Sequence, residues 1–309
     1  MGACTERRLR PWLGTYVAIE ASMDDRRAAS TAIEAAFSEV AVIHAAMSFH
    51  ASDSELALLH REAHRRPTPV GPHTWAVLTQ ALHFARISDG VFDPTVAGQL
   101  VRLGALPRPE GPAPDTAATW RDIELINDRQ VHFHRPLWID LGGIAKGYAV
   151  DRAIDVLQRH GAQHAVVNAG GDLRVAGAPT HSQPLLIRDP ADPARCIPLG
   201  TVGARAVATS GEFLLGRRPG AGPISPLIGP DRRPRPASSR SVTVVADHCM
   251  LADGLTKVVA LLGADALPLL QALDAQAAIL AGPEDTLQTT GGFWAALGHP
   301  VPPGHTHHE

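Results

Sequence analysis

Two glycine pairs, at 142–143 and 170–171, constrain the fold of this chain more than any other feature. Glycine lets the backbone turn tightly and approach a ligand, because it has no Cβ. Between the pairs, apolar residues over 147–159 recur at helical spacing, and Gly161 is placed to end that helix in a left-handed conformation. We therefore predict strand, glycine turn, helix, strand, glycine turn and strand over 138–177.

The first glycine pair lies between a predicted strand at 137–139 and a predicted helix. Such a turn presents backbone N–H groups at the positive end of the helix dipole, which suits phosphate. Lys146 adds a point charge just inside the helix, and Asp140 ends the strand. The spacing matches neither the dinucleotide-binding G-x-G-x-x-G pattern nor a Walker A loop. A phosphate-binding turn and a purely structural turn are both compatible with this pattern.

The composition is that of a globular protein: 309 residues, 45% hydrophobic and 19% charged, with a net charge of -3. Nothing in this balance indicates a nucleic-acid partner. The three cysteines, Cys4, Cys196 and Cys249, are too far apart to indicate a disulfide framework. We expect no integral membrane segment. Because the N-terminus lacks the apolar segment of a signal peptide, we expect a cytoplasmic protein.

Periodicity predicts helices and strands in alternation along the chain. We therefore expect a mixed α/β (α+β) fold, with β-sheets flanked by helices, in one domain over 7–300 with room for two lobes. The His-rich tail, 301–309, is expected to be disordered. The predicted helices are 26–47, 75–87 and 249–262, and the predicted strands include 15–20, 131–135, 184–188 and 241–246.

The predicted strand 131–135 places His132 and His134 on one face, because side chains alternate along a strand. Two histidines at this spacing can bind a metal ion. With no third ligand nearby in the sequence, a solvated strand face is the favoured interpretation.

A family resemblance rests on two runs that contain the glycine pairs. These are Asp140-Leu-Gly-Gly-Ile-Ala-Lys-Gly-Tyr-Ala-Val-Asp151 and Val167-Asn-Ala-Gly-Gly-Asp-Leu173. Together they resemble the signature of the FAD:protein FMN transferases, the ApbE-like flavin transferases, and the resemblance covers roughly 7–263. It implies a two-lobed fold around a flavin-binding groove. It also implies an enzyme that passes FMN from FAD to a Ser or Thr hydroxyl of a partner flavoprotein and releases AMP.

The resemblance also implies which residues bind the flavin. His50 stands where relatives often carry a tyrosine against the flavin, and His50 and Phe92 would border the ring. Asp140 and Lys146 would grip FAD together with the 142–143 turn. The full set that the resemblance implies for FAD binding is Met47, His50, Val91, Phe92, Asp93, Asp140, Lys146 and Ile224.

The resemblance implies a Mg²⁺ site on the helix 249–262, with Asp253, Thr256 and the Gly143 carbonyl as ligands. Lys257 stands where relatives carry the metal-binding threonine. Mg²⁺ prefers hard oxygen ligands. One outcome is that Lys257 points aside while the metal binds. Another is that Lys257 replaces the metal and neutralises the FAD pyrophosphate. A third is that Asp253 and Lys257 form only an ion pair on the helix surface. In the first two cases Asp253, Thr256 and Lys257 are the candidate catalytic residues.

The segment 216–239 departs from the family pattern. Gly222 stands where relatives have a histidine, and Ser225 where they have an aspartate. His50 and His248 are candidate substitutes for that histidine as general acid or base. These departures keep two alternatives open: an FAD-binding protein or carrier without transferase activity, and an FAD pyrophosphate hydrolase. The segment also holds four arginines, which we interpret as a solvated basic loop: Arg217, Arg218, Arg232 and Arg233.

Overall fold

The computed structural model describes residues 3–178, 182–190, 192, 194–211, 224–236, 240–281, 286–298 and 307–308. The chain divides into two compact units, each built from segments that are not contiguous in sequence. The first unit comprises Met1–Ala41, Lys146–Leu214 and Ala237–Glu309, and the second comprises Val42–Ala145 and Leu215–Pro236.

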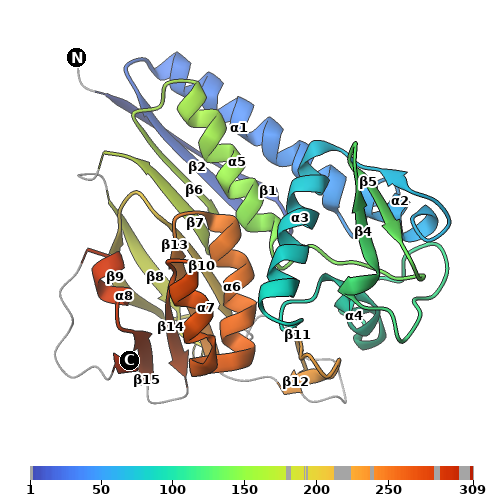
Figure 1. Ribbon diagram of the computed structural model, residues 1–309. Coiled ribbons are helices and arrows are strands. Elements are labelled where there is room, and N and C mark those ends of the chain that lie inside the picture. The colour runs from blue at the N-terminus through green and yellow to red at the C-terminus, as the bar shows by residue number, and fades with distance from the viewer. Residues whose placement is uncertain are drawn as a thin grey trace. The chain divides into compact units, whose positions relative to one another are not determined.

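The first unit is built on a nine-stranded sheet in the order β1-β2-β6-β7-β10-β13-β14-β15-β16 (Figure 1). Neighbouring strands run antiparallel, except that β15 and β16 are parallel. The strands are β1 (Cys4–Trp12), β2 (Thr15–Met23), β6 (His164–Ala169), β7 (Asp172–Gly177), β10 (Ala206–Gly211), β13 (Arg240–Ala246), β14 (Gln276–Ala281), β15 (Thr286–Thr290) and β16 (His307–His308). β16 belongs to the tail that the sequence suggested would be disordered; the rest of 301–309 lies outside the described residues.

Both faces of this sheet are covered, because buried residues of its strands enter two different cores, and those of β7 and β10 enter both. On β10, Ala206 packs into one core and Val207 into the other. The first core lies under α1 (Arg26–Met47), α5 (Ala145–Arg159) and the start of α6 (Cys249–Leu262). The second lies under α8 (Phe293–Ala296) and the hairpin of β8 (Gln183–Arg188) and β9 (Cys196–Val202). Two covered faces explain why β13 is buried nearly throughout.

The strand β1 precedes the predicted strand 15–20 and was hidden by its charge. It alternates half-buried and exposed residues at the edge of the sheet, where charged side chains are common. β1 and β2 form a hairpin across Leu13 and Gly14, whose φ values are 57° and 73°. Two consecutive positive φ values are typical of the two-residue turns that suit twisted antiparallel strands.

The segment Cys249–Ala272 is long and apolar enough to cross a membrane by length and composition alone. In the structure it is interrupted at Gly263, whose φ is 59°, and forms α6, a 3₁₀ turn η4 (Gly263–Ala266) and α7 (Leu267–Ala272). α6 contacts β10 and β13. The apolar face of this helix therefore belongs to the core of the sheet.

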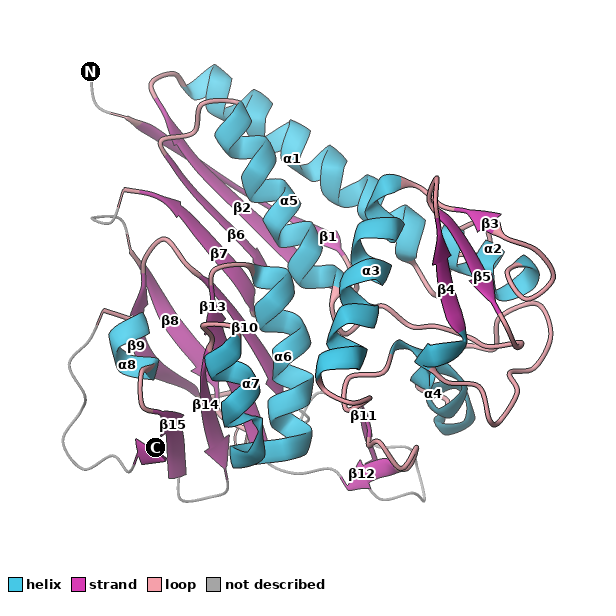
Figure 2. Cartoon of the chain, in the orientation of Figure 1, coloured by secondary structure: helices cyan, strands magenta, loops and turns pink. Residues whose placement is uncertain are grey.

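The second unit is mainly helical and contains two small sheets, β3-β5-β4 and β11-β12 (Figure 2). α3 begins with a proline at its first position, where the missing N–H costs nothing. The elements are α2 (Glu55–Glu62), β3 (Thr68–Pro69), α3 (Pro72–Ile87), η1 (Pro94–Val96), α4 (Ala97–Leu103), η2 (Trp120–Asp122), β4 (Ile123–Ile126), β5 (Gln130–Phe133), β11 (Ile224–Ile228) and β12 (Pro234–Pro236).

The apolar run 137–139 is buried but is not a strand, so this part of the prediction was wrong. The side chain of His60 takes the place of a strand partner. Its Nε2 lies 3.0 Å from the carbonyl oxygen of Ile139 and 3.1 Å from its amide nitrogen, and each tautomer of the ring uses one of them. Burial lowers the pKa of His60 to about 4, although the bond to Ile139 opposes this shift.

We expect acid to destabilise the protein through His60. The unfolded chain takes up a proton near pH 6.5, whereas folded His60 stays neutral until about pH 4. The free energy of unfolding should therefore fall as the pH drops from 6.5 to 4, by about 3 kcal/mol in total, and the loss should level off below pH 4. The measurement is denaturant unfolding across this range for the parent and for His60→Gln. His83→Gln, which changes an exposed histidine of α3, is the control. A fall of equal size in parent and His60→Gln would contradict the prediction.

Candidate functional site

The first turn of α5 lies directly against the start of α6 in the first unit. A Cβ added at Gly147 would lie 2.3 Å from the carbonyl oxygen of Cys249 and 2.8 Å from the Cα of Met250. Glycine is therefore what allows these two backbones to approach. The approach also lets the Gly147 N–H donate to Oδ2 of Asp253 over 3.1 Å.

Asp151, further along α5, caps the N-terminus of α6. Its carboxylate accepts hydrogen bonds from the backbone N–H groups of Cys249 and Met250, both over 2.9 Å, and from Arg174 of β7 over 2.8 Å. His248 occupies the capping position of α6 but makes no capping bond with its own side chain. A carboxylate at this end of a helix is stabilised by the orphan N–H groups and by the helix dipole. Burial raises the pKa of Asp151, although these same partners oppose the shift.

Four charged side chains meet beside this cap, and we call them the Lys–Asp cluster: Lys146, Asp172, Asp253 and Lys257. Lys146 Nζ lies 2.5 Å from Asp172 Oδ2 and 3.4 Å from Asp253 Oδ2. Lys257 Nζ pairs with Asp253 Oδ1 and also donates to the Asp253 carbonyl oxygen over 3.0 Å. The chain has two lysines among its 28 Lys and Arg residues, and both are in this cluster.

The ammonium groups and carboxylates of the cluster hold one another in their charged forms. Burial disfavours charge on Lys146, but the Asp172 and Asp253 carboxylates outweigh it and hold the Lys146 pKa above its ordinary value. Burial likewise opposes ionisation of Asp253, yet Lys146, Lys257 and the Gly147 N–H keep its pKa below the ordinary value. Asp172 is the exception: burial and the nearby Asp253 charge raise its pKa to about 6.

The cluster presents its positive groups outward. The side chains of Asp253 and Asp172 are 0% and 3% exposed, whereas those of Lys146 and Lys257 are 30% and 23% exposed. The two lysines therefore form the part of the cluster that solutes can reach. Lysine is a compact point charge suited to phosphate groups, so this surface can attract an anion.

The Mg²⁺ site implied by the resemblance does not fit this arrangement. Both carboxylate oxygens of Asp253 already have partners in the protein. Oδ1 pairs with Lys257, and Oδ2 accepts hydrogen bonds from Lys146 and from the Gly147 N–H. The Thr256 hydroxyl is fully buried and donates to the Asp253 carbonyl oxygen over 2.7 Å. Gly143 belongs to the second unit, and the part of its carbonyl in a metal site stays a prediction. An ammonium group thus occupies the side of the carboxylate where a cation would bind, and Lys257 does not point aside.

In the second unit, Asp93 organises the loop after α3. It accepts hydrogen bonds from the backbone and hydroxyl of Thr95 over 2.8 and 2.6 Å, and it pairs with Arg232 over 3.2 Å. Arg232 also donates to the Thr95 hydroxyl over 3.0 Å. The interpretation of Arg232 as part of a solvated basic loop was therefore wrong, whereas Arg217 and Arg218 lie outside the described residues.

Two further flavin-binding candidates of this unit are buried side chains. Phe92 packs against Phe84 with ring centroids 5.6 Å apart, and Met47 ends α1 with 8% of its surface exposed. Val91 is half-buried, and His50 is exposed. His50 is therefore a surface histidine in this structure, and its contact with a flavin stays a prediction.

The first glycine turn is held by Asp140, whose Oδ1 accepts the Gly142 N–H over 3.0 Å. In this structure that amide is used within the turn, as in a structural turn. Ile224 begins β11, and Gly222 lies outside the described residues. The predicted FAD-binding residues thus divide between the units, with Lys146 in the first and the others in the second. Their use in one flavin site stays a prediction.

Sequence reasoning missed three charged residues of this site. Asp172 lies directly after the second glycine pair, inside the motif that carried the resemblance, and its position was the available signal. Asp151 ends the first motif that carried the resemblance and had the same signal, whereas Arg174 had none. These two side chains are 23 positions apart in sequence, and the fold brings β7 close enough to α5 for them to pair. Arg174 Nη1 lies 2.8 Å from Asp151 Oδ1.

Comparison with known proteins gives consistent results. The sequence model of the ApbE family matches residues 13–280. An FAD:protein FMN transferase of Vibrio cholerae is 31% identical over 232 residues, covering 70% of this chain and 69% of the relative. One of Haemophilus influenzae is 30% identical over 247 residues, covering 72% and 70%.

Solved structures of the same kind resemble the fold. The ApbE protein of Thermotoga maritima superposes with a TM-score of 0.81 at 24% identity, covering 95% of this chain and 99% of that one. The flavin transferase ApbE of Vibrio cholerae gives 0.73 at 25% identity, covering 93% and 96%. The family model spans most of the chain, and both relatives are matched over more than two thirds of their length. This chain therefore belongs to the ApbE family of flavin transferases.

Proposed function

We propose that this protein is an FAD:protein FMN transferase that needs no Mg²⁺ ion, because the ammonium groups of Lys146 and Lys257 neutralise the FAD pyrophosphate. The observation that carries the proposal is the outward side of the Lys–Asp cluster, where both lysines stand in front of buried carboxylates. Family membership supports the reaction, and the cluster supports the way its charge is balanced.

In the proposed reaction, a Ser or Thr hydroxyl of a partner flavoprotein attacks the FMN phosphorus of FAD. A new P–O bond forms to the hydroxyl oxygen, the P–O bond to the AMP half breaks, AMP leaves and one proton is released. Phosphoryl transfer needs neutralisation of the developing charge and an aligned nucleophile more than it needs covalent help from the protein. Lys146 and Lys257 would supply the charge, and Asp172 and Asp253 would hold the two lysines in place.

The experiment is a transfer assay with the purified protein, FAD and an FMN-binding acceptor domain that carries a Ser/Thr flavinylation site. An FMN-sized mass increase on the acceptor, with AMP in equal amount, is the expected result. Free FMN with AMP would indicate a pyrophosphate hydrolase instead. Intact FAD, bound to the protein while a control transferase modifies the same acceptor, would indicate a carrier.

A second prediction tests the role of Lys257. FAD binding by the parent should be insensitive to EDTA. Lys257→Thr should bind FAD at least about tenfold more weakly in EDTA, because a charge-assisted contact of about 1.5–3 kcal/mol is lost. Mg²⁺ should restore binding to Lys257→Thr, because the threonine hydroxyl and Asp253 then offer oxygen ligands. The measurement is an FAD titration followed by flavin fluorescence.

The matched control for this test is Lys257→Met, which removes the same charge without supplying a hydroxyl. It should bind FAD weakly with or without Mg²⁺. If EDTA weakens FAD binding by the parent, the lysine does not replace the metal and this part of the proposal fails, whatever the transfer assay shows.

A further inference from the structure

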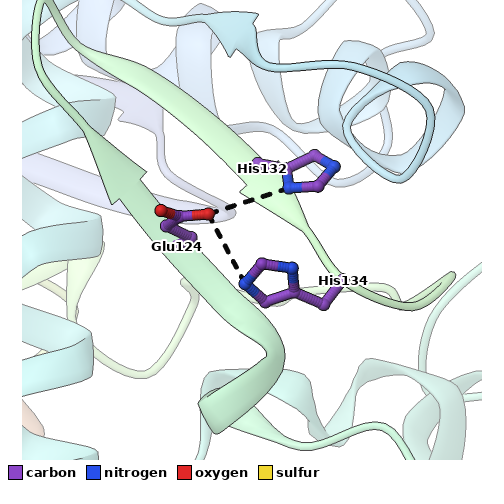
Figure 3. Close-up of side chains that lie close together, drawn as sticks. All are labelled: Glu124, His132 and His134. Atoms are coloured by element: carbon purple, nitrogen blue, oxygen red, sulfur yellow. Dashed lines mark ion pairs between the residues drawn. The ribbon is translucent and has the colours of Figure 1, made fainter.

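The hairpin of β4 and β5 in the second unit brings three metal-binding side chains together: Glu124, His132 and His134 (Figure 3). His134 Nε2 lies 3.5 Å from Glu124 Oε2, and His132 Nδ1 lies 3.9 Å from the same oxygen. The two imidazole rings meet edge to face, with centroids 5.1 Å apart. The third ligand that the sequence did not reveal is thus Glu124, which the strand pairing places directly opposite His132.

The register that brings these residues together is fixed by the buried face of the hairpin. Val131 and Phe133 of β5 are 0% and 1% exposed, and their neighbours across the pair, Leu125 and Ile123, lie on the same face. A shift by one residue would move these apolar side chains into solvent. Because side chains alternate, Glu124, His132 and His134 must share the opposite face, where they are partly exposed.

The charges around the trio do not oppose a cation. Arg135 follows His134 directly, but it pairs with Asp115 over 3.2 Å and with Asp122 over 3.3 Å. Its positive charge is therefore balanced by two carboxylates. Each histidine of the trio has one ring nitrogen toward Glu124, and a neutral imidazole can offer that nitrogen to a metal.

We propose that Glu124, His132 and His134 bind one divalent transition-metal ion of the zinc class. Two imidazoles and one carboxylate are a ligand set that Zn²⁺ uses in tetrahedral sites with a water in the fourth position. With bonds of about 2.0–2.1 Å, ligand atoms at tetrahedral angles lie about 3.3 Å apart. The observed separations of 3.5 and 3.9 Å need only small side-chain movements to reach this geometry. Mg²⁺ is excluded as the natural occupant, because imidazole suits zinc-class metals better than hard cations.

The site joins two strands of one hairpin, so a bound ion should stabilise the second unit. An ion that binds the folded and not the unfolded chain stabilises the fold by RT ln(1 + [ion]/Kd), so the melting temperature should rise with the concentration of the ion. This inference does not depend on the proposed transferase activity, because it concerns other residues and another ligand.

The experiment uses the full chain with His305, His307 and His308 changed to Gln, because this His-rich tail would bind metal ions by itself. After removal of metal with a chelator, Co²⁺ is titrated as a spectroscopic substitute for Zn²⁺. We expect one Co²⁺ per chain, a visible absorption spectrum typical of tetrahedral coordination, displacement by Zn²⁺, and a higher melting temperature with Zn²⁺ present.

Variants assign the ligands. His132→Gln with His134→Gln, and separately Glu124→Gln, should weaken Zn²⁺ binding at least about 100-fold, since even partners outside the coordination sphere are worth 10–100-fold. His83→Gln should bind as the parent does. Absence of stoichiometric Co²⁺ binding in the tail-substituted chain would overturn the proposal. Equal affinity in the ligand variants, whose metal-free melting temperatures serve to verify folding, would overturn it too.

Discussion

Gly147→Ala should destabilise the protein by about 2 kcal/mol or more, although alanine is the better helix former. The helix preference of alanine over glycine is worth about 1 kcal/mol in favour of the variant. Against it stands a Cβ placed 2.3 Å from the carbonyl oxygen of Cys249 and 2.6 Å from its carbonyl carbon. These are backbone atoms and cannot rotate away, so α5 and α6 must separate. Overpacking of this kind typically costs 1–3 kcal/mol and sometimes more.

The separation should also weaken the cluster, because the Gly147 N–H bond to Asp253 and the Asp151 cap both depend on the close approach. Denaturant unfolding of parent and variant is the measurement. Gly203→Ala is the control, since no atom lies within 4 Å of a Cβ at that position, and its effect should stay within about 0.5 kcal/mol. Equal stability of Gly147→Ala and the parent would show that the helices can move apart at little cost.

Asp253→Asn should cost about 3–5 kcal/mol of stability. Asp253 is fully buried, and its carboxylate balances Lys146 and Lys257 while accepting the Gly147 N–H. The amide keeps the size of the side chain but cannot balance the ammonium groups. Removing one partner of a buried ion pair leaves an uncompensated charge, and that penalty dominates the cost.

A double-mutant cycle separates this charge effect from a packing effect. If the cost comes from unbalanced ammonium groups, then Asp253→Asn combined with Lys257→Met should lose less stability than the sum of the two single changes, by about 0.5–3 kcal/mol. Additive losses would mean that Asp253 and Lys257 contribute independently to stability, so that charge balance between them does not set the cost. Chemical denaturation of the four proteins measures the cycle.

Long amphipathic helices were the most predictable part of this fold. The predicted limits 26–47 and 249–262 are those of α1 and α6, because each helix buries a continuous stripe against the sheet. The mixed α/β class followed from the alternation of such helices with strands. The edge strand β1 was missed because its inward-facing residues are only partly buried and its charges mask the period.

The parts that could not be predicted depend on partners distant in sequence. The run 137–139 has the composition of a strand, but its backbone is satisfied in part by the side chain of His60, 79 positions away. The Lys–Asp cluster shows the same limit. Family resemblance indicated Lys146, Asp253 and Lys257, but the pairing of Lys146 with Asp172 needs the second glycine turn to face α5. The third ligand on β4 became visible only through strand register.

The order of segments in the first unit has a consequence for how the protein is made. This unit draws on the start, the middle and the end of the chain, and the whole second unit is encoded before it is complete. β10 and β14 are joined through β13, and Asp253 follows β13, so the residues up to Asp253 must be synthesised before the cluster can be neutralised. Until then Lys146 and Asp172 have only each other, and the apolar strands of the sheet lack their neighbours. Domains generally fold as units during synthesis, with N-terminal parts first. In this chain the segments of the second unit are all synthesised before the first unit is complete, and the Lys–Asp cluster is among the last features that can form.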